Sequence, residues 1–196
     1  MGNIADKVNT TYNKIFNSKK EINVILLGLD YVGKTTILNK LIESDSNEKD
    51  DKNDTNKVVM HIPTIGFNVE KLTVNNFSIN CWDVGGADRI RPLWRHYYQS
   101  TDAIIYVVDC NDHERFNETK DQFNYLLPEE DLKNKPILVF ANKQDLNNAA
   151  SPNEIVELLN LNEITDRKWK IQGSSGINNI GLSEGFEWLA KCFDKE

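Results

Sequence analysis

An eight-residue loop that begins at Gly28 constrains the fold of this chain more than any other segment. Its sequence, Gly28-Leu-Asp-Tyr-Val-Gly-Lys-Thr35, matches the phosphate-binding pattern G-x-x-x-x-G-K-[ST]. The apolar run 22–27 before it predicts a buried strand, and residues 36–42 after it carry apolar side chains at helical spacing. Successive N–H groups of such a loop form an anion site at the helix N-terminus. The sequence therefore predicts a strand, a loop and a helix that together hold phosphate.

Individual residues of this loop have separate tasks in that chemistry. Gly28 and Gly33 permit backbone angles that a side chain would obstruct. Lys34 can reach the outer phosphates, and the Thr35 hydroxyl can bind Mg²⁺. We expect contacts with the phosphates from seven consecutive residues: Asp30, Tyr31, Val32, Gly33, Lys34, Thr35 and Thr36. The alternative is a glycine turn that precedes a helix by chance, and the loop alone does not identify the nucleotide.

Composition and charge exclude several classes of protein. A chain of 196 residues with 39% apolar and 27% charged residues is expected to form one soluble domain. The net charge of -7 argues against non-specific nucleic-acid binding, and no apolar run is long enough to span a membrane. The three cysteines, Cys81, Cys110 and Cys192, are widely spaced and form no metal-ligand pattern. With no secretory signal, these features predict a chain in the reducing cytosol.

Strand and helix patterns alternate from residue 58 onward. Two strands, 67–74 and 77–83, flank Asn75-Asn76, a favourable two-residue hairpin turn. Further strands are expected at 103–108, 137–141 and 169–171, and helices at 114–127, 152–160 and 182–193. This order predicts an α/β three-layer sandwich with a mostly parallel six-stranded sheet and one antiparallel hairpin strand.

The N-terminal segment, residues 1–18, is expected to form a separate amphipathic helix. Its apolar stripe comprises Ile4, Val8, Tyr12, Ile15 and Phe16. The helix can pack on the domain, leave it for a membrane surface, or do each in turn. Gly2 is a candidate for N-myristoylation, although Asp6 stands where the acylation motif prefers Ser or Thr. One acyl chain binds membranes only marginally, so the apolar stripe would be a second anchor.

Residues 43–57 have no apolar side chain and contain six acids and three bases. This composition predicts a solvated, disordered loop, inserted into a domain that otherwise covers residues 19–196. An acidic docking site is the alternative.

Three later stretches identify the nucleotide. Asp83-Val-Gly-Gly86 ends one strand: Asp83 can hold Mg²⁺, and Gly86 lets its N–H approach the terminal phosphate. Asn142-Lys-Gln-Asp145 ends another, where Asp145 can accept both N1–H and the 2-amino group of guanine while the Lys143 stem covers the base. The third stretch comprises Ser174, Ser175 and Gly176, where a backbone N–H can meet guanine O6. Because parallel α/β sheets bind ligands at the C-terminal ends of their strands, we expect these stretches to form one guanine-nucleotide site.

At these residues the chain resembles a small GTPase of the Ras superfamily, and specifically the ADP-ribosylation factor (Arf) family. The telling segments are Ile62-Pro-Thr-Ile-Gly-Phe-Asn-Val-Glu70, Trp82-Asp-Val-Gly-Gly86, Ile90-Arg-Pro-Leu-Trp-Arg-His-Tyr97 and Asn142-Lys-Gln-Asp-Leu146. The resemblance covers nearly the whole chain apart from 43–57. It implies the small-GTPase fold, GTP or GDP with Mg²⁺ as ligands, and a monomeric switch in vesicle-mediated protein transport. It also implies exchange factors, GTPase-activating proteins and effectors, and a cytoplasmic chain that binds Golgi or other endomembranes reversibly.

The resemblance assigns further roles to individual residues. Thr64 would close over Mg²⁺ when the terminal phosphate is present, making Thr35, Thr64 and Asp83 the metal ligands. Catalysis would involve Lys34, Thr64, Gly86 and residue 87. The hairpin at about 67–82 would slide between nucleotide states and displace the N-terminal helix. An effector surface is expected at Phe67, Trp82 and Tyr97, for which ordinary core packing is the alternative.

Two positions depart from the family pattern. Ala87 stands where the family usually carries the glutamine that orients the attacking water, so hydrolysis should be slow. Whether Ala87 is native or engineered stays open, and so do two function classes: a cycling GTPase and a binding module that hardly hydrolyses GTP. Tyr31 replaces a usually small residue, and its ring could cover the phosphates or restrict a partner's arginine. An ATP-dependent kinase is disfavoured by Asn142-Lys-Gln-Asp145.

Overall fold

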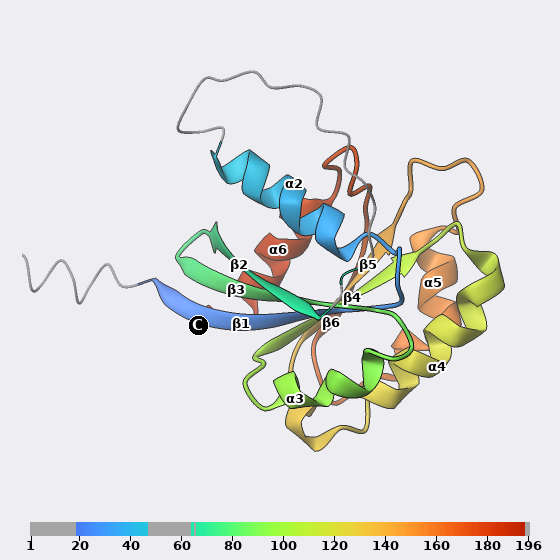
Figure 1. The fold of residues 1–196 in the computed structure, drawn as a ribbon, viewed down its shortest axis with the longest axis horizontal. Helices are drawn as coiled ribbons and strands as arrows, with labels where there is room; N and C mark the ends of the chain where they lie inside the picture. Colours follow the sequence, from blue (N-terminus) through green and yellow to red (C-terminus); the bar gives the residue numbers. More distant parts are fainter. Residues whose placement is uncertain (1–18, 47–63, 65, 195–196) are drawn as a thin grey trace, which may run out of the picture.

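The computed structural model describes residues 19–46, 64 and 66–194, and its centre is a six-stranded sheet (Figure 1). The strand order is β2-β3-β1-β4-β5-β6, with β2 antiparallel to β3 and the other neighbours parallel. The strands are β1 (Lys20–Leu27), β2 (Phe67–Val74), β3 (Phe77–Val84), β4 (Ala103–Asp109), β5 (Ile137–Asn142) and β6 (Trp169–Gly173). The predicted α/β fold with one antiparallel hairpin strand is confirmed.

Helices cover the two faces of the sheet and make the three layers. They are α2 (Lys34–Ser46), α3 (Arg95–Tyr98), α4 (Phe116–Leu126), α5 (Pro152–Leu158) and α6 (Leu182–Lys191). Short 3-10 turns add η1 (Arg91–Leu93), η2 (His113–Arg115), η3 (Glu130–Leu132) and η4 (Leu161–Glu163). Apolar residues of α2 and α6 pack on one face of the sheet, and those of α3, α4 and α5 pack on the other (Figure 1).

The sequence pattern accounts for the two kinds of strand. Every residue of β5 and all but the last residue of β4 are buried, as expected for central parallel strands with helices on both faces. Strand β2 lies at the sheet edge and is mostly exposed. Its hairpin turn to β3 uses Asn75 at a φ of 52°, a left-handed conformation that asparagine tolerates. Cys81 and Cys110 are buried, as the apolar runs around them predict.

Helix α2 is longer than the apolar spacing alone predicts. It continues to Ser46, so the first four residues of the polar segment 43–57 are helical and the prediction of a disordered loop is wrong for 43–46. An ion pair of 2.8 Å between Lys40 and Glu43 extends the last turns, and the Ser44 hydroxyl donates to the Lys40 carbonyl. The rest of that segment lies outside the described residues, as do the predicted N-terminal helix 1–18 and the acylation candidate Gly2.

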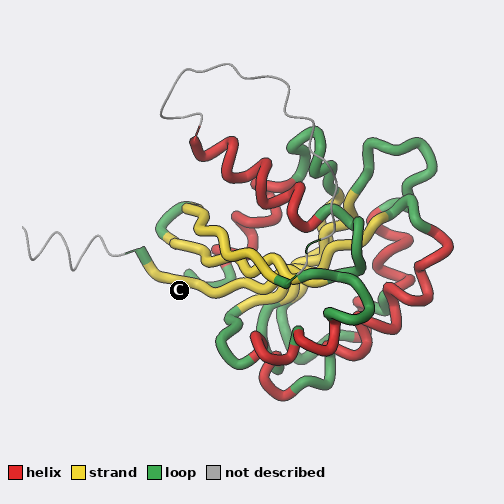
Figure 2. The backbone as a smooth tube through the Cα atoms, viewed as in Figure 1, coloured by secondary structure: helices red, strands yellow, loops and turns green. Residues whose placement is uncertain are grey.

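The loops that matter for function follow the C-terminal ends of the strands (Figure 2). Gly28 follows β1, Gly85 follows β3, Lys143 follows β5 and Ser174 follows β6. Because β1, β3, β5 and β6 run in the same direction, these loops meet at one edge of the sheet. That edge carries the candidate site.

Candidate functional site

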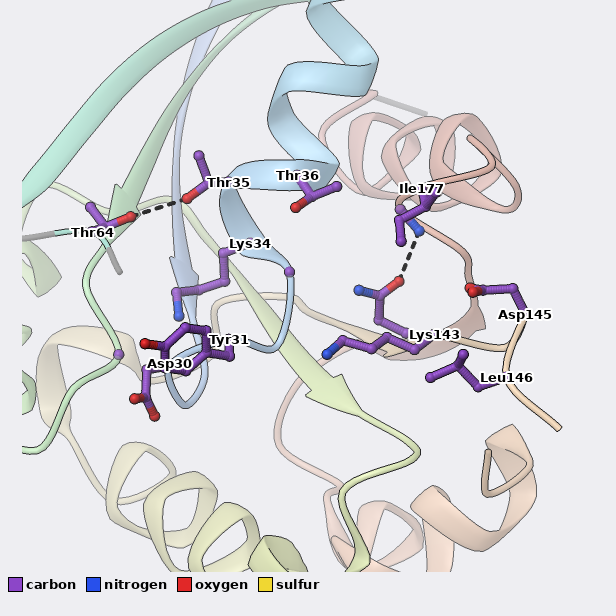
Figure 3. Close-up of a pocket in the computed structure, with 14 residues that line it drawn as sticks. Asp30, Tyr31, Lys34, Thr35, Thr36, Thr64, Lys143, Asp145, Leu146 and Ile177 are labelled. Carbon is purple, nitrogen blue, oxygen red and sulfur yellow. Dashed lines mark hydrogen bonds between the residues drawn. The ribbon is translucent and has the colours of Figure 1, made fainter. Parts of the chain in front are cut away.

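A cavity of about 380 Å³ opens at this edge of the sheet (Figure 3). Its lining residues come from the phosphate loop, the start of α2, the segment before β2 and the loops after β3, β5 and β6: Asp30, Tyr31, Gly33, Lys34, Thr35, Thr36, Thr64, Gly86, Asn142, Lys143, Asp145, Leu146, Gly176 and Ile177. Twelve of these were expected from the sequence. The cavity therefore joins five segments that are separate in the chain.

The phosphate loop wraps around the side chain of Lys34. Gly28 and Gly33 have φ angles of 136° and 101°, which side chains rarely adopt. The Lys34 ammonium is buried and donates to the carbonyls of Gly28 at 2.9 Å and Leu29 at 2.7 Å. Burial lowers the pKa of Lys34 to about 8, although Asp83 and Asp30 act to raise it. A phosphate in the cavity would give this buried cation a counter-charge.

Oxygen atoms of three predicted metal ligands lie together beside Lys34. Thr35 Oγ1 donates to Asp83 Oδ2 at 2.5 Å and lies 3.1 Å from Thr64 Oγ1 (Figure 3). Asp83 is buried, and its second oxygen, Oδ1, has no hydrogen-bond partner. Burial raises the pKa of Asp83, while the Thr35 hydroxyl and Lys34 lower it. Hard oxygen donors with one unpaired buried carboxylate oxygen fit Mg²⁺.

The segment after β3 presses against the phosphate loop. A Cβ added at Gly86 would meet backbone atoms of Gly28 and Leu29, so only glycine allows this approach. Arg91 Nε donates to the Gly86 carbonyl at 2.7 Å, and Trp94 Nε1 donates to the Gly85 carbonyl at 2.9 Å. These bonds orient the Gly85-Gly86 segment at the phosphate end of the cavity.

Ala87 lies just beyond that segment and lines a second cavity of about 490 Å³. The two cavities share Asp30. Glutamine, which the family usually carries at residue 87, has a side-chain amide. Among the described residues that line either cavity, Asn142 is the only one with such an amide. Its Nδ2 donates to the Val32 carbonyl and its Oδ1 accepts from Gly176 N, so neither end is spare.

Asn142 also ties the phosphate end of the site to the opposite end. It bonds the phosphate loop at Val32 O at 2.8 Å and accepts Gly176 N–H at 3.0 Å and the Ser174 hydroxyl at 3.3 Å. Ser175 Oγ donates to Asp145 Oδ1 at 2.6 Å, which holds this exposed carboxylate at the rim. The structure thus brings the Asn142–Asp145 and Ser174–Gly176 stretches together, as the sequence predicts. Val32, Ser174, Ser175 and Asp83 support the cavity without lining it.

Several site residues were missed by the sequence analysis. Leu146 and Ile177 line the cavity with apolar side chains at the end that holds Asp145 (Figure 3). Arg115 comes from η2, and its Nη1 contacts Asp30 Oδ1 at 2.7 Å while its Nη2 donates to the Asp30 carbonyl at 3.1 Å. Ile177 carried one signal: it is one of two apolar residues, with Ile180, in an otherwise polar loop. Arg115 carried none, because 85 residues separate it from Asp30.

The three aromatic residues of the expected effector surface form one cluster. The ring centroids of Phe67, Trp82 and Tyr97 are 5.3–5.6 Å apart. Phe67 is 47% exposed, and the other two rings are half-buried against the core. The cluster packs on the domain and presents an apolar face, and its role in effector binding stays a prediction.

Comparison with known proteins agrees with this geometry. A sequence model of the ADP-ribosylation factor family matches residues 8–193 of this chain. The chain belongs to the ADP-ribosylation factor family. It is therefore a small GTPase, a GTP-dependent switch, and the resemblance inferred from the motifs is confirmed.

Individual relatives of this Arf-family chain are similar over most of their length. ADP-ribosylation factors J and K of Dictyostelium discoideum are each 47% identical over 182 residues, which is 93% of this chain and 90% of each relative. A solved structure of the Arl6 BBS3 small GTPase from Trypanosoma brucei, with the bound nucleotide analogue GppNp, is 34% identical with a TM-score of 0.75. That match covers 88% of this chain and 97% of the other. In the described part of this Arf-family chain, no helix has the length and apolar character needed to cross a membrane.

Proposed function

We propose that the 380 Å³ cavity holds GTP or GDP with its phosphates at Lys34 and its guanine at Asp145. The observation that carries this proposal is the position of these two side chains at opposite ends of one cavity (Figure 3). Lys34 would exchange its bonds with the loop carbonyls for the outer phosphates. Asp145, steadied by Ser175, would accept the two adjacent guanine donors, which adenine lacks.

We propose that Thr35, Thr64 and Asp83 hold Mg²⁺ beside the phosphates. Support comes from their three clustered oxygens and from the unpaired Oδ1 of Asp83. A bound Mg²⁺ neutralises charge on the β- and γ-phosphates. Thr64 would remain in this cluster only while the terminal phosphate is present, and its release after hydrolysis would be the switching event. Gly86 N–H would detect the same phosphate from the other side.

Hydrolysis by this chain should be slow because residue 87, where the family usually carries the glutamine that orients the attacking water, is alanine. Ala87 has no hydrogen-bonding side chain, and both ends of the Asn142 carboxamide are used. The nearby carboxylate of Asp30 is held by Arg115. Water could still attack the terminal phosphate, but without the side-chain amide that the family places at residue 87. The chain would then remain in its GTP state for longer than a glutamine-bearing relative. The stronger form of the proposal is a binding module that hardly hydrolyses GTP.

Single-turnover hydrolysis of GTP tests this role of residue 87. The cavity beside Ala87 offers room for a glutamine, so Ala87→Gln should fold and raise the rate on the order of a hundredfold. Tyr125→Gln is the control, because Tyr125 is exposed on α4 outside both cavities. Equal rates for the parent and Ala87→Gln would refute the assignment. The co-purified nucleotide separates the two classes: mostly GTP favours the binding module, and mostly GDP favours a cycling switch.

We further propose that effectors bind the cluster of Phe67, Trp82 and Tyr97 in the GTP state, in vesicle-mediated protein transport. Support comes from the partly exposed apolar face of this cluster, whose Phe67 pairs with Val84, the residue before the Gly85-Gly86 segment. Exchange factors and GTPase-activating proteins of the Arf type would reset the switch. Reversible binding to Golgi or other endomembranes would use the N-terminal helix and an acyl group on Gly2. Mass spectrometry of the protein from cells and vesicle flotation with a Gly2→Ala control test the membrane part.

A further inference from the structure

Tyr31 combines two properties that are unusual for an aromatic residue. It has a φ of 61°, and its side chain is 57% exposed. Six described residues other than glycine have positive φ, and four of them are asparagines: Asn75, Asn134, Asn160 and Asn179. The remaining two, Tyr31 and Lys143, both line the nucleotide cavity. Bulky residues adopt this conformation only where the surroundings impose it, and such outliers concentrate at functional sites.

The neighbours of Tyr31 fix its backbone on both sides. On one side, Arg115 contacts the Asp30 carboxylate at 2.7 Å and its carbonyl at 3.1 Å. On the other, Asn142 Nδ2 donates to the Val32 carbonyl at 2.8 Å. Rotation of Tyr31 to a negative φ would disturb these bonds. The point where the side chain of Tyr31 leaves the loop is therefore fixed.

The ring of Tyr31 lies at the phosphate end of the cavity. Figure 3 shows Tyr31 beside Lys34 and Asp30, at the opposite end from Asp145 and Leu146. Since Lys34 is the cation for the outer phosphates, a ring here would stand between those phosphates and solvent. Exclusion of water strengthens the attraction between a phosphate and a buried ammonium.

We propose that the ring of Tyr31 covers the phosphates of the bound nucleotide and slows nucleotide release. This inference rests on the proposed use of the cavity for GTP and GDP. Release requires the ring to rotate aside or the phosphates to pass it, and the fixed backbone of residues 30–32 keeps the ring attached at the phosphate end of the cavity. Tyr31 is thus a positioning residue that sets how long the switch retains its nucleotide.

Release of a fluorescent GDP analogue from the full chain, chased with excess GDP in Mg²⁺, tests this role. Tyr31→Ala and Tyr31→Gly should release the analogue about tenfold faster, equivalent to about 1.4 kcal/mol. Tyr31→Phe keeps the ring and should retain the slow release. Tyr31→Gly also removes the backbone strain, so it should fold at least as well as the parent. Tyr125→Ala is the control, because Tyr125 is 71% exposed on α4 outside the cavity.

The outcomes are distinct. Parental or slower release from both Tyr31→Ala and Tyr31→Gly would overturn the inference, and so would fast release from Tyr31→Phe. Fast release from Tyr31→Ala alone would assign the effect to backbone strain and would also overturn it. Failure of the parent chain to bind the analogue would instead refute the proposed nucleotide site.

Discussion

Gly86 has no room for a side chain. A Cβ at this position would lie under 3.0 Å from backbone atoms of Gly28 and Leu29, a separation that real Cβ atoms essentially never show. The phosphate loop cannot retreat easily, because Asn142 and Arg115 anchor it through Val32 and Asp30. Gly86→Ala must therefore push the two segments apart. Overpacking of this kind costs about 1–3 kcal/mol. For a chain of this size, about 2 kcal/mol lowers the melting temperature by roughly 4–8 °C.

Thermal unfolding of the GDP-loaded chain measures this cost directly. Gly66→Ala is the matched control, because its Cβ would meet nothing within 4 Å and only its φ of +99° opposes the change. It should therefore lower the melting temperature less than Gly86→Ala does. If Gly86 N–H meets the terminal phosphate, Gly86→Ala should also lower the affinity for a non-hydrolysable GTP analogue more than the affinity for GDP. Competition binding measures both. A Gly86→Ala protein that melts at the parental temperature with an unchanged ratio of affinities would refute this reasoning.

Three further perturbations follow from charges at the site. Burial lowers the pKa of Lys34 to about 8, and a bound phosphate would raise it, so affinity for GDP should be constant at low pH and fall about tenfold between pH 7 and 9 in a fluorescence titration; a flat profile would contradict this. Burial raises the pKa of Asp83, so its ionised form costs stability as pH rises above the ordinary carboxyl pKa. Asp83→Asn should raise the melting temperature in EDTA and abolish the gain that Mg²⁺ gives the parent; a persistent gain would exclude Asp83 as a ligand. Arg115→Ala should lower the affinity for GDP roughly tenfold, because it leaves the negative charge of Asp30 without its ion-pair partner near the phosphates. Adding Asp30→Asn to that variant should restore binding, and no recovery would assign the effect to lost packing.

Most of the fold was predictable from local patterns in the sequence. The hairpin at Asn75-Asn76 was predictable because a two-residue turn between alternating strands has few solutions. Strands β4 and β5 were predictable because strands buried on both faces consist of continuous apolar residues. The phosphate loop was predictable because its glycines and lysine serve one chemistry at fixed spacing. The end of α2 was not predictable, because residues 43–46 have no apolar side chain to mark a helical face.

The sequence by itself determined the family, the guanine-nucleotide motifs and the absence of glutamine at residue 87, since each depends on residue types at short spacing. Only the tertiary structure decided that Arg115 neutralises Asp30, that Leu146 and Ile177 line the cavity, and that Asn142 joins its two ends. Only the structure also showed that the side chain of Tyr31 lies at the phosphate end of the cavity. The physical reason is that these contacts join segments from different strands. Their geometry depends on how the helices pack on the sheet and not on any pattern along the chain.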